Sequence, residues 1–431
     1  MVSQENNLKS ASAYLAWFAA ALFYYYQYIL RVSPGVMVTE LRAEFHMTAE
    51  QFSSLGALYL YAYSLLQIPL GILIDRIGVR RTVLGSVALC TLGTLMLAWS
   101  ESLLGAQLSR ICIGAGSAGA FMSALKIAAD WLPEGKRGLL MGTTLTLGTI
   151  GALTAGKPLV WFIDSIGWRS TVVGTAMVGV LVLILVLVLL RLPTKRQREA
   201  PKVKWADIGK SVWQIVRNRR VMIYAVLAIG VYTPLSVLAD LWGTAFLMQK
   251  FQLTRADAAQ TSMMMYFGLA IGSLLLPWLC EKWNMLDQAI KLCGFGIFIV
   301  FGFILFGPNV GIGGLTALLI LLGIFCGAEM MCFTGAVRYT TPETSGMTLG
   351  VVNTLNMLGG AILQQAIGFL LDVRWSGQSD AAGVRIYQTH EFVVALSLLL
   401  VVVASCCLIS LTSHFQPLTP ATEDEAKHKA T

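Results

Sequence analysis

The sequence predicts an all-α integral membrane protein with twelve transmembrane helices, arranged as two six-helix halves around a central cavity. Its 431 residues are 56% hydrophobic and only 13% charged, whereas a soluble domain carries about 25% charged residues. Apolar stretches of roughly 20 residues, the length that crosses a bilayer core, recur from end to end. Such spans must be helical, because lipid offers no partner for backbone N–H and C=O groups.

The apolar stretches place the spans in order along the chain. The polar residues before Ala11 are too few for a cleaved signal region, so the first span is expected to be retained. The expected spans are 12–36, 50–74, 82–100, 103–131, 138–163, 169–192, 221–249, 257–280, 287–307, 312–337, 346–371 and 390–412.

A long polar interval, residues 193–220, divides six spans from six. We therefore expect an N-terminal bundle (1–192), a cytoplasmic linker (193–220), a C-terminal bundle (221–412) and a disordered cytoplasmic tail (413–431). At an offset of 208 residues, a repeat aligns the fifth and eleventh spans, as a duplicated six-span unit predicts. The aligned residues are Gly138, Gly142, Gly151 and Asp164 with Gly346, Gly350, Gly359 and Asp372.

The net charge of +8 is unevenly placed. Lys and Arg gather in the central linker and on the side of the termini, which the positive-inside rule makes cytoplasmic. A basic loop also fits anionic lipid or nucleic acid, but orientation already explains it, so no nucleic-acid partner is expected. The eight cysteines lack metal-ligand spacing, and no nucleophile–base pair or HExxH motif is present. We expect no enzyme activity, metal or cofactor.

The first span has one polar face. Tyr24, Gln27, Tyr28 and Arg31 follow the i, i+3, i+4, i+7 spacing of a helix, so they share one side. A guanidinium cannot face lipid at this depth, and its planar fork suits a carboxylate or phosphate. The competing interpretation is that Arg31 reaches the outer interface.

Spans two and four add further candidates. Tyr59, Tyr63 and Gln67 repeat at helical spacing and extend the expected polar wall. Arg110 and Lys126 lie sixteen residues apart in span four, about 24 Å along the axis, too far for one substrate to bridge. Lys126 is a candidate second cation, and a pair with Asp130 one turn on is the alternative.

The second half carries buried acids and amides. Asp240 and Glu329 are candidate proton sites, because burial favours the neutral carboxyl group and lets it bind and release a proton. A structural partner such as Arg338 is the alternative for Glu329. Trp242 and the amides of span eleven either contact substrate or join helices; those amides include Asn353, Asn356 and Gln364.

Two motifs resemble a known family. The loop from Gly71 to Arg81 fits G-x-x-x-D-R-x-G-x-R-R and resembles the loop between spans two and three of the major facilitator superfamily. The resemblance implies that this loop holds the inner gate shut, with Gly71, Asp75, Arg76, Gly78, Arg80 and Arg81 as gating residues. Orientation alone explains Arg80 and Arg81 but not the glycines. The run Arg110–Gly119 resembles the fourth-span motif, which implies a proton-coupling role for Arg110.

The stretch Leu125–Pro133, with Lys136-Arg137-Gly138 and Gly167-Trp168-Arg169, resembles the anion:cation symporter and organophosphate antiporter branch. The Tyr-rich segment 24–28 departs from it. The resemblance implies an organic anion substrate and a monomer in a bacterial inner membrane. The run Leu153–Pro158 lacks the exporter motif G-P-x-x-G-G and favours uptake, so we expect a proton-coupled importer of a small organic anion, such as an organic acid or polycarboxylate siderophore. The alternatives are an importer of amino acids or nucleosides, and a drug or solute exporter.

Overall fold

The computed structural model describes residues 2–190, 205–341 and 344–412, and the described residues are almost entirely helical. The expected tail and linker residues 193–204 lie outside the described residues. Eleven described helical segments are long and apolar enough to cross a membrane. The expected first span falls within a further helix, α1 (Val2–Val36), which packs against α5, α6 and α8. The membrane-helix architecture is therefore confirmed.

The helices before residue 190 form one packed group, here called the first helix group. Its members after α1 are α2 (Val38–Glu44), α3 (Ala49–Ile77), α4 (Val79–Trp99), α5 (Leu103–Trp131), α6 (Glu134–Thr154), α7 (Lys157–Ile166) and α8 (Trp168–Leu189).

The second helix group follows Asn218 and packs in the same manner. It contains α10 (Arg219–Val237), η1 (Leu238–Trp242), α11 (Gly243–Phe251), α12 (Arg255–Trp283), α13 (Leu286–Phe306), α14 (Gly311–Cys326), α15 (Glu329–Val337), α16 (Ser345–Arg374) and α17 (Thr389–Thr412). Between the groups lies α9 (Trp205–Arg217), so the expected polar linker contains a helix that contacts α10 and α16.

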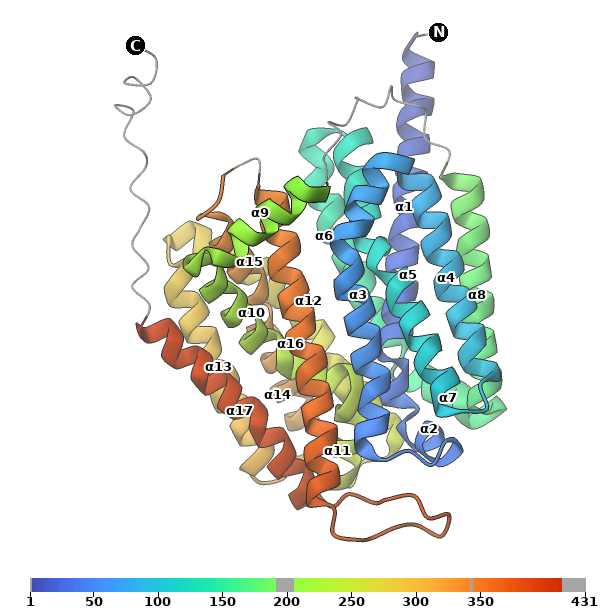
Figure 1. Ribbon diagram of the computed structural model, residues 1–431, viewed down its shortest axis with the longest axis vertical. Coiled ribbons are helices and arrows are strands. Elements are labelled where there is room, and N and C mark those ends of the chain that lie inside the picture. Colours follow the sequence, from blue (N-terminus) through green and yellow to red (C-terminus); the bar gives the residue numbers. More distant parts are fainter. Residues whose placement is uncertain (1, 191–204, 342–343, 413–431) are drawn as a thin grey trace.

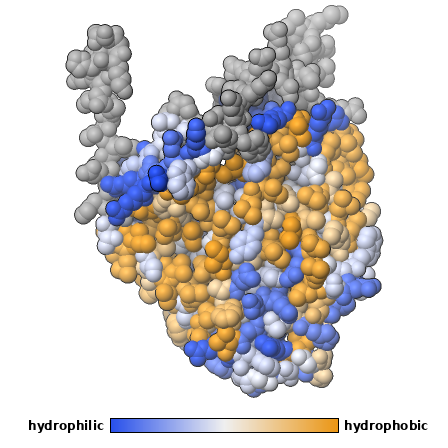
Figure 2. Space-filling view, viewed as in Figure 1, coloured by the Kyte–Doolittle hydropathy of each residue, from blue (hydrophilic) through white to orange (hydrophobic). Residues whose placement is uncertain are grey.

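The molecule has two distinct ends (Figure 1). The start of α1, the α3–α4 turn and α9 lie at one end, called the α9 face; the loop between α16 and α17 lies at the opposite face. Between the ends, orange apolar side chains cover much of the visible side, while blue hydrophilic residues gather near both ends (Figure 2). A bilayer around the apolar side matches this distribution.

Three expected spans are interrupted. The fifth breaks after α6, and α7 then begins at Lys157 with Pro158 as its second residue. The tenth breaks at Gly327 and Ala328, between α14 and α15. The seventh contains Pro234, which lacks an N–H group, followed by η1, one turn of π-helix. Interruptions of this kind are tolerated inside membrane proteins where the backbone lines a cavity or packs against other helices, and Glu329 and Asp240 both lie at such breaks.

The turns that precede α3 and α12 repeat one another. Phe45-His46-Met47-Thr48 corresponds to Phe251-Gln252-Leu253-Thr254. His46 and Gln252 both have positive φ, 48° and 54°. Each threonine then caps the next helix, accepting hydrogen bonds from Gln51 and Asp257 backbone N–H groups respectively. This match supports the internal duplication expected from the glycine repeat.

Candidate functional site

A cavity of about 1380 Å³ lies between the two helix groups. Its lining runs from Arg31 of α1 and Tyr232 of α10 to Asp75 and Arg76 at the α9-face end of α3. The Asp75 side chain is 53% exposed, which places that end in contact with solvent. The cavity therefore opens at the α9 face.

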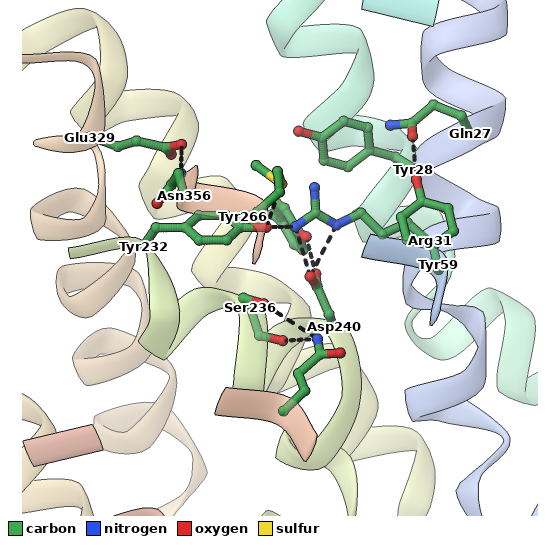
Figure 3. A network of polar contacts seen from close by, with 12 residues as sticks. Gln27, Tyr28, Arg31, Tyr59, Tyr232, Ser236, Asp240, Tyr266, Glu329 and Asn356 are labelled. Carbon is green, nitrogen blue, oxygen red and sulfur yellow. Dashed lines mark hydrogen bonds and ion pairs between the residues drawn. The ribbon is translucent and has the colours of Figure 1, made fainter. Parts of the chain in front are cut away.

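The inner end of the cavity is built around an ion pair that joins the two groups (Figure 3). Arg31 donates from Nε (3.0 Å) and Nη2 (2.7 Å) to one carboxylate oxygen of Asp240. Nη2 also donates to the Tyr232 hydroxyl, and the Tyr266 hydroxyl donates to the other Asp240 oxygen. The third guanidinium nitrogen points away from Asp240 in Figure 3. Both charged side chains are almost fully buried, at 7% and 4% exposed, so each needs the other to offset desolvation.

Backbone packing brings these two residues together. A Cβ atom on Gly35 would lie 2.8 Å from the Asp240 carbonyl oxygen and 2.9 Å from that of Leu241. Only glycine permits α1 to approach η1 this closely. Gly35 lies one helical turn after Arg31, so the close approach positions the guanidinium beside the carboxylate of the π-helical turn.

Arg110 has a positioning role in this conformation. Its guanidinium donates to three backbone carbonyls, those of Leu55 (2.9 Å), Leu30 (2.7 Å) and Arg31 (3.3 Å). The Leu30 carbonyl is available because Pro34, four residues on, has no N–H group. Arg110 is 1% exposed and is not among the cavity-lining residues. It fixes the end of α1 that carries Arg31, and its expected part in proton coupling stays a prediction.

Side-chain hydrogen bonds join the predicted polar residues to one another. Tyr59 donates to the Gln27 side-chain oxygen at 2.7 Å, and Tyr24 donates to the Tyr28 hydroxyl at 3.2 Å. Asn353 of α16 donates to Gln67 of α3 at 2.7 Å, which is a second contact between the helix groups.

Glu329 lies on the cavity wall at the first residue of α15 and is 6% exposed. It accepts a hydrogen bond from the Asn356 side-chain nitrogen at 2.5 Å. Its structural partner is thus Asn356, whereas the sequence suggested Arg338. Asn356 Oδ1 is a buried oxygen without a hydrogen-bond partner in the described part of the chain.

The loop motif lies at the open end. Asp75 pairs with Lys126 at 3.0 Å, and Lys126 also pairs with Asp130 at 3.4 Å. The expected i, i+4 pair is therefore present. Arg80 donates to the Leu187 carbonyl. These contacts of Asp75, Lys126 and Arg80 stay within the first helix group.

The opposite face is closed by contacts between the groups. Asp372, near the end of α16, accepts hydrogen bonds from the first two N–H groups of α3, those of Ala49 (3.1 Å) and Glu50 (2.8 Å). Asp164, near the end of α7, pairs with Arg255, the first residue of α12. The two aspartates that the sequence repeat aligns thus each bind the start of a helix in the other group. We call them the paired latches.

The structure gathers most of the predicted wall at the cavity. The predicted residues that line it are Tyr24, Gln27, Tyr28, Arg31, Tyr63, Gln67, Gly71, Asp75, Arg76, Lys126, Glu329 and Asn353. Nine predicted residues are not among its lining: Tyr59, Gly78, Arg80, Arg81, Arg110, Asp240, Trp242, Asn356 and Gln364. Trp242 is fully buried and donates to Ser53 across the group interface at 3.0 Å. Gln364 donates to the Ser236 carbonyl at 2.7 Å.

Sequence reasoning missed Tyr266 and Phe121. Tyr266 contacts Asp240 from α12, and Phe121 lines the cavity beside Tyr24. Neither has a charged, amide or tyrosine neighbour at helical spacing in the sequence, so the periodicity that identified Arg31 gives no signal for them.

A bundle of membrane-length helices in two groups, with a cavity between them that carries buried polar and charged side chains, is the architecture of a secondary transporter. The chain belongs to the major facilitator superfamily, whose family model matches residues 16–363. The expected family is thereby confirmed, and with it a transporter fold rather than an enzyme.

Three curated relatives are transporters. An uncharacterized transporter of Bacillus subtilis, YybO, is 30% identical over 40% of this chain and 39% of its own length. A probable sulfoacetate transporter of Cupriavidus necator is 26% identical over 37% of each chain. The chain thus matches less than half the length of these two relatives. A D-galactonate transporter of Escherichia coli is 22% identical over 80% of this chain and 85% of its own length.

A solved structure supports the same fold. The crystal structure of a bacterial homolog of the human lysosomal transporter Spinster, inward-facing and unoccupied, superposes with a TM-score of 0.75. It is 16% identical and covers 94% of this chain and 99% of its own.

Proposed function

We propose that this protein is a proton-coupled importer of a small organic anion that works by alternating access. The observation that carries the proposal is the buried Arg31 on the cavity wall, held by Asp240 of the other helix group. Two curated relatives are named for transport of anions, sulfoacetate and D-galactonate. In this proposal the α9 face is cytoplasmic, because Lys210, Arg217, Arg219 and Arg220 lie in or beside α9.

The two helix groups act as rigid halves, residues 1–192 and 221–412, joined by the linker 193–220. The cavity is open at the α9 face and the paired latches are formed, which corresponds to the inward-facing arrangement if the α9 face is cytoplasmic, as proposed here. Rocking of the halves breaks the latches and closes the α9 face, so the same cavity meets the outside. The loop motif at Asp75 and Arg76 then acts as the inner gate.

Arg31 anchors the substrate anion. Its Nε and Nη2 atoms already bind Asp240, and the third nitrogen is directed away from that carboxylate (Figure 3). A substrate carboxylate therefore binds at this third nitrogen or replaces Asp240. Either event weakens the buried charge contact between the halves, because one guanidinium is then shared between two anions.

Proton coupling follows from the same contact. A proton on Asp240 would remove the negative charge that holds Arg31. The proton and the substrate anion would therefore both weaken the Arg31–Asp240 contact between the halves. Glu329 is the second proton site, since it is buried on the cavity wall and bound by a neutral amide rather than by a cation. Lys126 lies at the mouth and attracts anions without holding them.

Uptake into proteoliposomes tests this function. Radiolabelled D-galactonate and sulfoacetate are the probes, each with and without a pH gradient, alongside Arg31→Ala, Arg31→Lys and the matched surface control Arg217→Ala. We expect gradient-stimulated uptake of at least one anion by wild type and by Arg217→Ala, little by Arg31→Lys and none by Arg31→Ala. Gradient-stimulated uptake of equal size in wild type and Arg31→Ala would refute the role of Arg31.

A further inference from the structure

A row of aromatic rings extends from Arg31 along the cavity wall. The Arg31 guanidinium lies 5.6 Å from the ring centre of Tyr28, and Tyr28 meets Tyr24 edge to face at 5.0 Å. Tyr24 in turn packs on Phe121 at 5.1 Å. All four residues line the cavity. The row thus begins at the cation and continues with apolar ring surface contributed by α1 and α5.

The remaining wall near Arg31 has the same character. The ring centre of Tyr232 lies 5.7 Å from the Arg31 guanidinium. The Tyr232 hydroxyl donates a hydrogen bond to the sulfur of Met357 at 3.2 Å. Met330 and Phe333 line the cavity beside Glu329. Methionine adapts its shape to apolar ligands and makes favourable contacts with aromatic rings.

The small polar side chains of the wall already have partners. Asn353 donates to Gln67, and the Thr146 and Thr149 hydroxyls donate to carbonyls of their own helix. Ser273 donates to the Ala270 carbonyl in the same way. Because these side chains already donate their hydrogen bonds, a polyhydroxylated body would receive few new ones from them, and each hydroxyl group left unpaired is costly.

From these observations, and resting on the anion-transport function proposed above, we infer that the substrate is an amphipathic carboxylate with an aromatic or otherwise apolar body. The carboxylate binds Arg31 and the body lies along Tyr28, Tyr24 and Phe121. Ring faces recognise flat apolar groups through stacking and edge contacts. This substrate class differs from the polyhydroxylated sugar acid named for the D-galactonate relative.

Two monoanions with the same charged group and different bodies test the inference: 3-phenylpropionate and gluconate. Their dissociation constants are measured on the purified full-length protein by isothermal titration, together with the uncharged 3-phenylpropionamide. We expect 3-phenylpropionate to bind at least tenfold more tightly than either of the others. Tighter binding of gluconate, still dependent on Arg31, would overturn the inference and leave the proposed function standing. Equal binding of the amide and the acid would overturn the proposed function instead.

A matched pair of variants isolates the ring row. Phe121→Leu removes the ring at its end and keeps an apolar side chain, and Phe303→Leu makes the same change at an exposed position on α13, outside the cavity. Phe121→Leu is expected to weaken 3-phenylpropionate binding about two- to tenfold, the size of a lost ring contact. The dissociation constant of gluconate should differ less than twofold between Phe121→Leu and wild type. An equal loss in both variants, or no loss in Phe121→Leu, would contradict the assigned position of the substrate body.

Discussion

Gly35 of α1 and Asp240 of η1 meet at a distance that only glycine allows, with the Asp240 carbonyl oxygen 2.8 Å from where a Cβ atom would lie. This contact joins the two helix groups one turn from the Arg31–Asp240 ion pair. The charge pair and the close packing therefore belong to one interface. A change at either residue should alter both anion binding and the closure of the opposite face.

Gly35→Val is expected to favour opening of the opposite face. The added side chain collides with the backbone of Asp240 and Leu241, neither of which can rotate away. Spin labels at Glu101→Cys and Asn309→Cys, in exposed loops of the two groups, report the separation. We expect a longer distance in Gly35→Val. The control Gly174→Val, where a Cβ atom meets nothing within 4 Å, should match wild type; an unchanged distance in Gly35→Val would show that this contact does not close the face.

Asp372→Asn should weaken one of the paired latches. The Asp372 carboxylate accepts two N–H groups at the start of α3, and a negative charge there contributes about 0.3–1 kcal/mol, up to about 2 when partly buried. We expect the outward-open population to rise, and to rise further in Asp372→Asn with Asp164→Asn. The same spin-label pair measures these populations. If neither substitution changes the distribution, the aspartates do not hold the face shut.

The repeat glycines at the mouth predict how the α9 face closes. A Cβ atom on Gly142 would lie 3.8 Å from a Leu274 side-chain atom, and one on Gly350 would lie 3.6 Å from an Ile68 side-chain atom. Both are ordinary van der Waals contacts with the other helix group, and both glycines line the cavity, so a small side chain fits there in this conformation. Closure must bring helices together there. Gly142→Leu with Gly350→Leu should therefore keep anion affinity within about threefold but reduce uptake more than about tenfold. Normal uptake by this double variant would mean that the mouth closes elsewhere, and Gly174→Leu is the matched control.

Lys126→Ala should affect anion affinity far less than substitution of Arg31. Lys126 is 38% exposed and already binds Asp75 and Asp130. Exposed ion pairs contribute about 0–1 kcal/mol, so we expect less than a fivefold loss of affinity, together with a slower association rate at low salt. A loss as large as that of Arg31→Lys, measured by titration of the same anion, would instead place the substrate at the mouth.

The sequence predicted the membrane helices and the polar face of α1 because both follow from local patterns. Helix spacing alone places Tyr24, Gln27, Tyr28 and Arg31 together, and the structure confirms that all four line the cavity. Hydrophobic length likewise predicted the eleven described segments long and apolar enough to cross a membrane, although it gave no sign of α9 within the polar linker.

Contacts between distant segments were not predictable in this way. The partner of Arg31 lies 209 residues away, and it is positioned by a π-helical turn whose local sequence resembles ordinary helix. Trp242 and Gln364 are apolar-span residues of the type that binds substrates, yet tertiary packing buries them between helices. The repeat that aligns Asp164 with Asp372 was visible in the sequence. Its role became clear only from the structure, in which each aspartate contacts the start of a helix in the other group.

The central claim is that one guanidinium, Arg31, serves both Asp240 and the substrate anion. The most direct measurement is the dissociation constant of the transported anion in wild type, Arg31→Lys and Asp240→Asn at one pH. Removal of the competing carboxylate should tighten anion binding about tenfold in Asp240→Asn, while Arg31→Lys should weaken it more than about tenfold, because a lysine lacks the planar fork. Unchanged affinity in Asp240→Asn, or unchanged affinity in Arg31→Lys, would contradict this account.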